Sequence, residues 1–262
     1  MTAMTVFRYE LQDLRRSRWV LGYLLCLALL TEALLRFSGG GPRAVLSLMN
    51  VVLGVVPLVS IVFGTMYLYG SRSFIQLLLA QPVGRGELFA GLYAGLALPL
   101  AAGFLLAVGL PFLWDGGGDG ALAAPLAMVL DAGTLLTLVF TALAVLVSLV
   151  VNDRAKGLGL AILIWVVVTA LYDALIVLVA TAFRDYPVEL PLIGLTLLNP
   201  IDVARVSMLL RLDTAALMGY TGAVFERFFG TFLGVTVSAA AVILWWVGPL
   251  ALARRRFCRK DF

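Results

Sequence analysis

Six long apolar runs dominate this sequence and restrict what the chain can fold into. Each run is about 20 residues or longer, which is enough for a helix to cross the hydrocarbon core of a bilayer. Most charged residues lie in the stretches between the runs. The predicted spans are residues 19–37, 45–69, 88–113, 122–151, 157–183 and 231–253.

The composition excludes a soluble domain. Hydrophobic residues make up 62% of the 262 residues and charged residues only 13%, whereas soluble domains have roughly 45–50% and 25%. The net charge of +4 is modest, so we expect no nucleic-acid partner. The sequence therefore predicts an all-α membrane protein, with residues 1–262 forming a single transmembrane domain.

Several kinds of chemistry are excluded by the residues that the sequence lacks. The chain has no His, hence no imidazole base and no zinc site of the usual kind. A P-loop needs Gly-Lys followed by Ser or Thr, but Lys156 is followed by Gly157 and Lys260 by Asp261. We therefore expect no catalytic residues, no metal site and no cofactor on this chain.

The distribution of Lys and Arg predicts the orientation of the spans, because basic residues concentrate in cytoplasmic loops. Thirteen of the nineteen basic residues fall on one side, which places both termini in the cytoplasm. These thirteen are Arg8, Arg15, Arg16, Arg18, Arg72, Arg85, Arg154, Lys156, Arg254, Arg255, Arg256, Arg259 and Lys260.

Residues 1–18 precede the first span and have a helical period. Met4, Phe7, Leu11 and Leu14 recur on one face, with charged residues on the other. This pattern predicts an interfacial amphipathic helix on the cytoplasmic side. The alternative is a charged tail that only fixes the orientation.

Residues 70–87 form the first cytoplasmic loop, and they include a short apolar helix over 73–80. The helix is too short to span the membrane, so its apolar face must be buried in another way. This predicts a coupling helix that docks on a cytoplasmic protein. A re-entrant or interfacial linker is the alternative. The next inner loop, 152–157, is a charged turn that would suit a second contact. The predicted docking residues are Phe74, Leu77, Leu78, Pro82, Arg85, Glu87, Asp153 and Arg154.

Residues 184–230 form the longest outer segment. Asn199 followed by Pro200 predicts a helix start, with Asn as the cap. Asp202 and Arg205 can pair at i,i+3, and Met208 lies on the apolar face. We predict two amphipathic helices on the outer surface, which either shield the bundle or form a platform for a periplasmic partner through Asn199, Asp202, Arg205 and Met208.

Three acids lie within predicted spans, where charge is expensive. Glu32 has Arg36 one turn later, which predicts a local ion pair. Asp131 and Asp173 lie in the outer half. The three could line a polar cavity, or they could be satisfied by Arg184, Asn50 or water.

The order of these segments resembles the type-2 ABC exporter permeases: an N-terminal amphipathic elbow, six spans, a docking loop and a basic tail. The most specific part of the resemblance is the sequence of residues 77–89, LLLAQPVGRGELF. Within that family the chain is most similar to the NosY group, which serves the maturation of nitrous-oxide reductase. Residues 152–159, NDRAKGLG, and 198–205, LNPIDVAR, carry this closer resemblance.

The resemblance implies a homodimer, a cytoplasmic ATPase of the NosF type and a periplasmic copper-handling partner of the NosD type. It also implies a role in assembling the copper centres of the reductase. Three alternatives stay open: a generic exporter of a drug, lipid or peptide; an intramembrane enzyme, for which only Glu32 and Asp173 are candidates; and a structural anchor.

Overall fold

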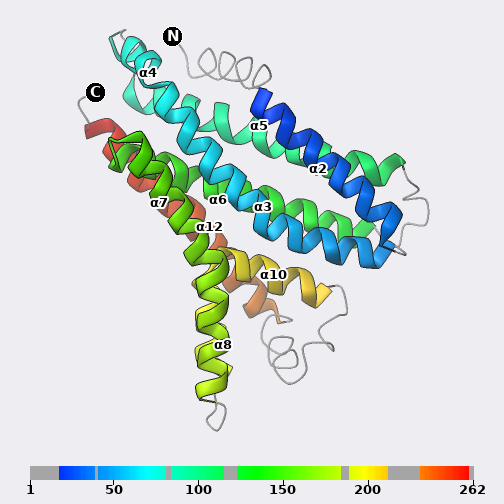
Figure 1. The fold of residues 1–262 in the computed structure, drawn as a ribbon. Coiled ribbons are helices and arrows are strands. Elements are labelled where there is room, and N and C mark those ends of the chain that lie inside the picture. Colours follow the sequence, from blue (N-terminus) through cyan, green and yellow to red (C-terminus); the bar gives the residue numbers. More distant parts are fainter. Residues whose placement is uncertain are drawn as a thin grey trace.

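The structure, a computed structural model, describes residues 18–38, 41–80, 84–114, 123–183, 189–211 and 231–259. These ranges contain helices and no strand (Figure 1). Apolar runs form helices in a membrane because a helix satisfies its own backbone N–H and C=O groups. The amphipathic helix predicted for residues 1–18 lies almost wholly outside the described residues and stays a prediction.

The six predicted spans are confirmed, since six of the described helices are long and apolar enough to cross a membrane. The last helix departs most from its predicted bounds, because it continues beyond residue 253 to Arg259. The spans are α2 (Arg18–Phe37), α3 (Gly41–Gly70), α5 (Arg85–Trp114), α6 (Ala123–Val150), the series α7 (Arg154–Val166), π-helix η2 (Val167–Leu171) and α8 (Tyr172–Ala182), and α12 (Phe232–Arg259).

Helix α6 lies at the centre of the bundle and packs against α3, α5, α7, α10 and α12. Phe140 of α6 and Phe104 of α5 are fully buried in the main apolar core. Gly133 of α6 lets this packing form, because a Cβ there would overlap the Phe104 ring. By contrast, the α7–α8 span is covered very little by the rest of the chain.

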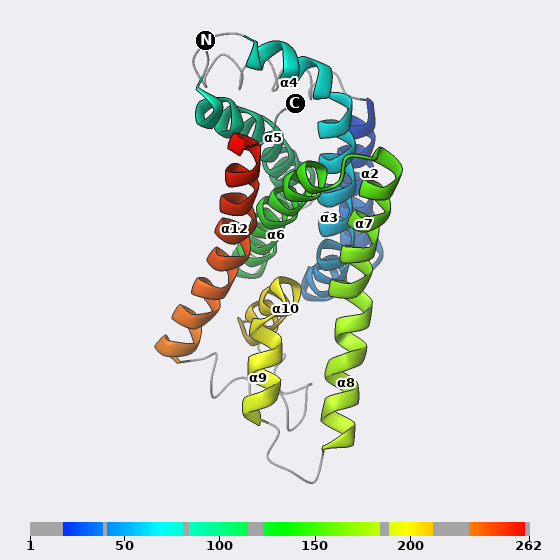
Figure 2. The ribbon, with the colours of Figure 1, turned by 90° about the vertical axis from the view of Figure 1, so that its left-hand side faces the viewer.

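The short helices mark the two ends of the bundle (Figure 2). Helix α4 (Arg72–Leu79) lies at the same end as the last turn of α12, and we call this the α4 end. Helices α9 (Glu189–Leu197) and α10 (Pro200–Arg211) lie toward the opposite end, between α12 and α8, and we call this the far end.

The prediction that residues 199–211 lie on the outer surface is wrong. Helices α9 and α10 meet at an angle of 110°, as in a broken span or re-entrant loop, and α10 is inserted against the bundle. Ile201 and Met208 are each only 1% exposed. Helix α10 is buried because it has apolar residues on most of its sides, while Arg205 pairs with Asp173 of α8 and with Asp202 of its own helix.

Candidate functional site

Helix α4 presents a different face to solvent from the one that its sequence suggests. Ile75 and Leu78 are 4% and 3% exposed and pack into the bundle, whereas Leu77 is 62% exposed. Phe74 packs in part against the same cluster. Leu78 is therefore not available to a docking protein in this arrangement, and the surface that α4 offers contains Ser73, Gln76 and Leu77.

Arg72, at the start of α4, connects this helix to the end of α6. Its guanidinium donates to the carbonyl oxygens of Ser148, Val151 and Asn152 at 3.0, 3.1 and 2.7 Å. It also lies 4.4 Å from the centre of the Tyr69 ring. A cation is favoured here because the carbonyls at a helix C-terminus carry partial negative charge. Arg72 thus fixes α4 to the turn that leads into α7.

The start of α7 is held by a cap and a close contact. The Asp153 carboxylate accepts the Lys156 N–H at 2.8 Å, as an N-cap. The Tyr69 hydroxyl donates to the Val151 carbonyl at 2.8 Å. A Cβ on Gly157 would overlap that hydroxyl, so only glycine allows this approach.

The start of α5 is joined to the end of α12 at the same end of the molecule. Arg85 donates to the Cys258 carbonyl at 2.9 Å, and the rings of Phe89 and Phe257 lie 5.6 Å apart. Among the other predicted docking residues, Glu87 and Arg154 are exposed. Pro82 lies outside the described residues. The structure therefore brings α4, α5, α7 and α12 together at one end.

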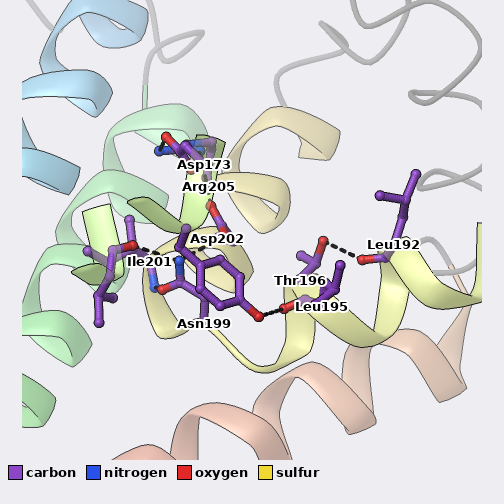
Figure 3. A network of polar contacts seen from close by, with 10 residues as sticks. Asp173, Leu192, Leu195, Thr196, Asn199, Ile201, Asp202 and Arg205 are labelled. Atoms are coloured by element: carbon purple, nitrogen blue, oxygen red, sulfur yellow. Dashed lines mark hydrogen bonds and ion pairs between the residues drawn. The ribbon is translucent and has the colours of Figure 1, made fainter. Parts of the chain in front are cut away.

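A second polar cluster lies at the junction of α8 and α10, and we call its four side chains, Asp173, Asn199, Asp202 and Arg205, the far network (Figure 3). The Arg205 guanidinium donates to both carboxylate oxygens of Asp173, at 2.7 and 3.0 Å, and to Asp202 at 3.0 Å. Asp202 is 4% exposed, Arg205 30% and Asp173 41%.

Asn199 joins this ion cluster to the backbone. Its amide donates to Asp202 Oδ2 and to the Val168 carbonyl, both at 2.8 Å, and its oxygen accepts the Ile201 N–H at 3.0 Å. The last bond confirms the predicted helix cap. Val168 lies in the π-helix η2. Short π-helical turns within α-helices occur frequently at functional sites.

Tyr172, which follows η2, completes the attachment of the broken pair. Its hydroxyl donates to the Leu195 carbonyl at the end of α9, at 2.8 Å (Figure 3). Both arms of the broken pair are therefore bonded to the same stretch of the α7–α8 span.

The three acids predicted for a common cavity do not meet. Glu32 accepts from Arg36 Nε at 2.7 Å, which confirms the local ion pair. Asp131 is exposed on α6. Asp173 pairs with Arg205, Asn50 donates to the Leu46 carbonyl, and Arg184 lies outside the described residues. In the part of the chain that the structure describes, no three Cys, Asp or Glu side chains are close enough to hold a metal ion.

Sequence reasoning missed two contacts that organise these sites. It used Arg72 only to assign the orientation of the spans. Arg72 follows Tyr69 by three residues at the end of a span, and this spacing could have predicted their cation–π contact. It paired Arg205 with Asp202 alone. A cation in an apolar segment needs compensation, and Asp173 was the remaining acid in the preceding span.

Comparison with known proteins agrees with this architecture. A family model described as "ABC-2 family transporter protein" matches residues 4–262. The chain is 28% identical to the "Probable ABC transporter permease protein NosY" of Stutzerimonas stutzeri, over 97% of each chain. It is 30% identical to the protein of the same description from Pseudomonas aeruginosa, over 98% of each. The chain therefore belongs to the ABC-2 transporter family, as a permease component of an ABC transporter.

Proposed function

We propose that this permease transmits ATP hydrolysis by a separate cytoplasmic ATPase to a periplasmic partner that matures the copper centres of nitrous-oxide reductase. The similarity to two NosY permeases over nearly the whole chain supports this role. The complex would contain two copies of the permease, an ATPase of the NosF type that holds ATP and Mg²⁺, and a periplasmic protein of the NosD type. Copper would be cargo or product, and not a resident cofactor of this chain.

The α4 end faces the cytoplasm in this proposal, and both termini lie on that side. Its exposed cations support this orientation, since basic residues favour the cytoplasmic side of an inner membrane. Arg254, Arg255, Arg256 and Arg259 are all exposed on the last turns of α12.

The exposed side of α4 is the surface that would bind the ATPase. Leu77 is apolar and 62% exposed at the end of the bundle, and a groove on a partner would remove it from water. Arg72 and Arg85 act indirectly, because they fix α4 and α5 to neighbouring helix ends. Glu87, Asp153 and Arg154 surround this surface as possible polar contacts.

One observation carries the coupling proposal: the α7–α8 span is attached to both sites. Arg72 of α4 donates to the Asn152 carbonyl just before α7, and Asp173 in α8 bonds to Arg205 of α10 in the far network. The stretch from Asn152 to Asp173 extends about 30 Å along a helix. A displacement of α4 would reach the broken pair α9–α10 through this span.

The broken pair as a unit would respond to that displacement and bear on the periplasmic partner. Asn199, Asp202 and Met208 are buried, so in this arrangement they position α10. The exposed residues Leu198 and Ser207 lie on the side that remains available to another protein.

A deletion strain tests the physiological role. We expect normal growth with oxygen, together with an exported nitrous-oxide reductase that lacks activity and has incomplete copper centres. Normal nitrous-oxide reduction by this strain would reject the role. Loss of drug resistance, or accumulation of a lipid or peptide, would favour a generic exporter instead.

Leu77→Asp tests the docking surface. Burying an unpaired carboxylate is strongly unfavourable, so this variant should insert normally but no longer co-purify with its ATPase. Cys258→Asp is the control, since it adds the same charge at an exposed position of α12 at the same end. Unchanged ATPase binding by Leu77→Asp would contradict the docking role.

A further inference from the structure

An open groove of about 700 Å³ runs between α2 and α5. Its walls are largely apolar, and Leu25 and Leu29 of α2 and Leu106 and Leu110 of α5 are all more than half exposed there. Neither the coupling proposal nor the far network uses this groove.

The groove has the length of one bilayer leaflet. On α2 its lining extends from Leu24 to Arg36, which is about 18 Å along a helix. The hydrocarbon core of a bilayer is about 30 Å thick, so half of it is about 15 Å. At the other end of this lining Leu24 packs closely against Gly103, since a Cβ on Gly103 would lie 2.8 Å from the Leu24 methyl groups.

The end of the groove away from α4 is polar. Glu32 and Arg36 form an ion pair in its wall, and Arg36 is 62% exposed. Glu32 accepts from Arg36 Nε and Nη2, which holds the guanidinium at the mouth and leaves Nη1 outside this ion pair. Trp114, 91% exposed at the end of α5, lines the same mouth. Exposed Trp and Arg at a span end are typical of the headgroup level.

We propose that the α2–α5 groove binds one phospholipid of the leaflet opposite α4, with an acyl chain along its leucines and the phosphate at Arg36. The guanidinium matches a phosphate in charge and hydrogen-bonding geometry. Apolar walls one leaflet deep match the chain in length. The lipid fills a space that neither α2 nor α5 fills, and this proposal is independent of the ATPase and of the reductase.

A phospholipid fits this groove better than a helix from a second copy. The groove wall carries a charged pair, whose guanidinium a phosphate complements and which an apolar helix would have to desolvate.

The test uses the purified permease–ATPase complex, delipidated in detergent and titrated with dioleoylphosphatidylglycerol, with bound lipid counted by native mass spectrometry. We expect one tightly bound lipid per permease chain. Arg36→Gln should weaken its binding about tenfold, the usual scale for losing a charged hydrogen bond, and Arg36→Lys should weaken it less. Ala28→Trp should abolish binding, because the ring fills the groove.

Leu244→Trp is the matched control, since Leu244 is 71% exposed on α12 and lies outside the groove; this variant should bind lipid normally. Unchanged binding by both Arg36→Gln and Ala28→Trp would overturn the proposal. Glycerol phosphate binding as tightly as the lipid would also overturn it, because the acyl chain would then contribute nothing. Disulfide cross-linking of two copies through Leu29→Cys in membranes would assign the groove to a second copy.

Discussion

At the α4 end, arginine side chains bond to main-chain carbonyls, whereas in the far network an arginine bonds to carboxylates. Arg72 and Arg85 each hold the C-terminal end of another helix. Arg205 instead lies between Asp173 and Asp202. The first arrangement uses the partial negative charge of helix ends. The second neutralises full charges within the chain.

This difference determines what each region can offer to another protein. None of the three ion pairs between described residues lies at the α4 end, so Glu87 and Arg154 remain on its surface with their charge available. The far network closes on itself beside the apolar core. The α4 end is therefore suited to contacts between chains, and the far network to holding one chain's broken helix pair in position.

The largest effect should follow from Arg205→Met. This change leaves Asp173 and Asp202 facing each other without their cation, and breaking such a pair by removing one partner costs about 3 kcal/mol or more. We expect a large fall in the thermal midpoint of the detergent-solubilised complex. Asp202→Asn is the control and should cost much less, because the bidentate Arg205–Asp173 pair survives. Equal loss in the two variants would contradict the network.

The spans could be predicted from the sequence because apolar length alone decides whether a helix can cross a bilayer. Local pairs could be predicted for a similar reason: Asn199 with Ile201, and Glu32 with Arg36, lie within one helical turn. The contact between Asp173 and Arg205 joins residues 32 positions apart, and no periodicity encodes it.

The orientation of the short helices also could not be predicted. Helix α4 has apolar residues on several sides, so its period does not say whether Leu77 or Leu78 is buried. That choice depends on the neighbouring helices, which cover Ile75 and Leu78. Helix α10 is similar, since its apolar residues suit either a membrane surface or the bundle interior.

Gly157→Ala tests the close contact at the α4 end. The new methyl group would overlap the Tyr69 hydroxyl, and overpacking of this kind costs about 2 kcal/mol. The thermal midpoint should fall and ATPase activity should lose its dependence on the permease. Gly159→Ala is a matched control two residues away, where a Cβ has nothing within 4 Å. Its stability should be unchanged or slightly higher, since alanine favours a helix.

Arg72→Gln should have a somewhat smaller effect on stability, about 1.5 kcal/mol, because partly exposed charged hydrogen bonds are worth the lower end of their range. Its effect on coupling should be larger, since α4 loses its attachment to the Ser148–Asn152 carbonyls. Arg72→Lys keeps the charge but cannot reach three carbonyls with one planar group. Its stability and coupling should therefore lie between those of the native protein and those of Arg72→Gln. The measurement is ATPase stimulation by permease in vesicles. Full stimulation by Arg72→Gln would show that α4 needs no such attachment.

The smallest effect separates two roles of Asp153, which caps α7 and also lies on the proposed ATPase surface. Asp153→Ala removes the bond to the Lys156 N–H and should cost about 1 kcal/mol. Asp153→Asn keeps a cap of similar quality but removes the charge, so its thermal midpoint should match the native protein. If the carboxylate also contacts the ATPase, affinity for the ATPase should fall in both variants. If Asp153 only caps the helix, Asp153→Asn should bind normally, and the docking surface is then confined to α4 and the start of α5.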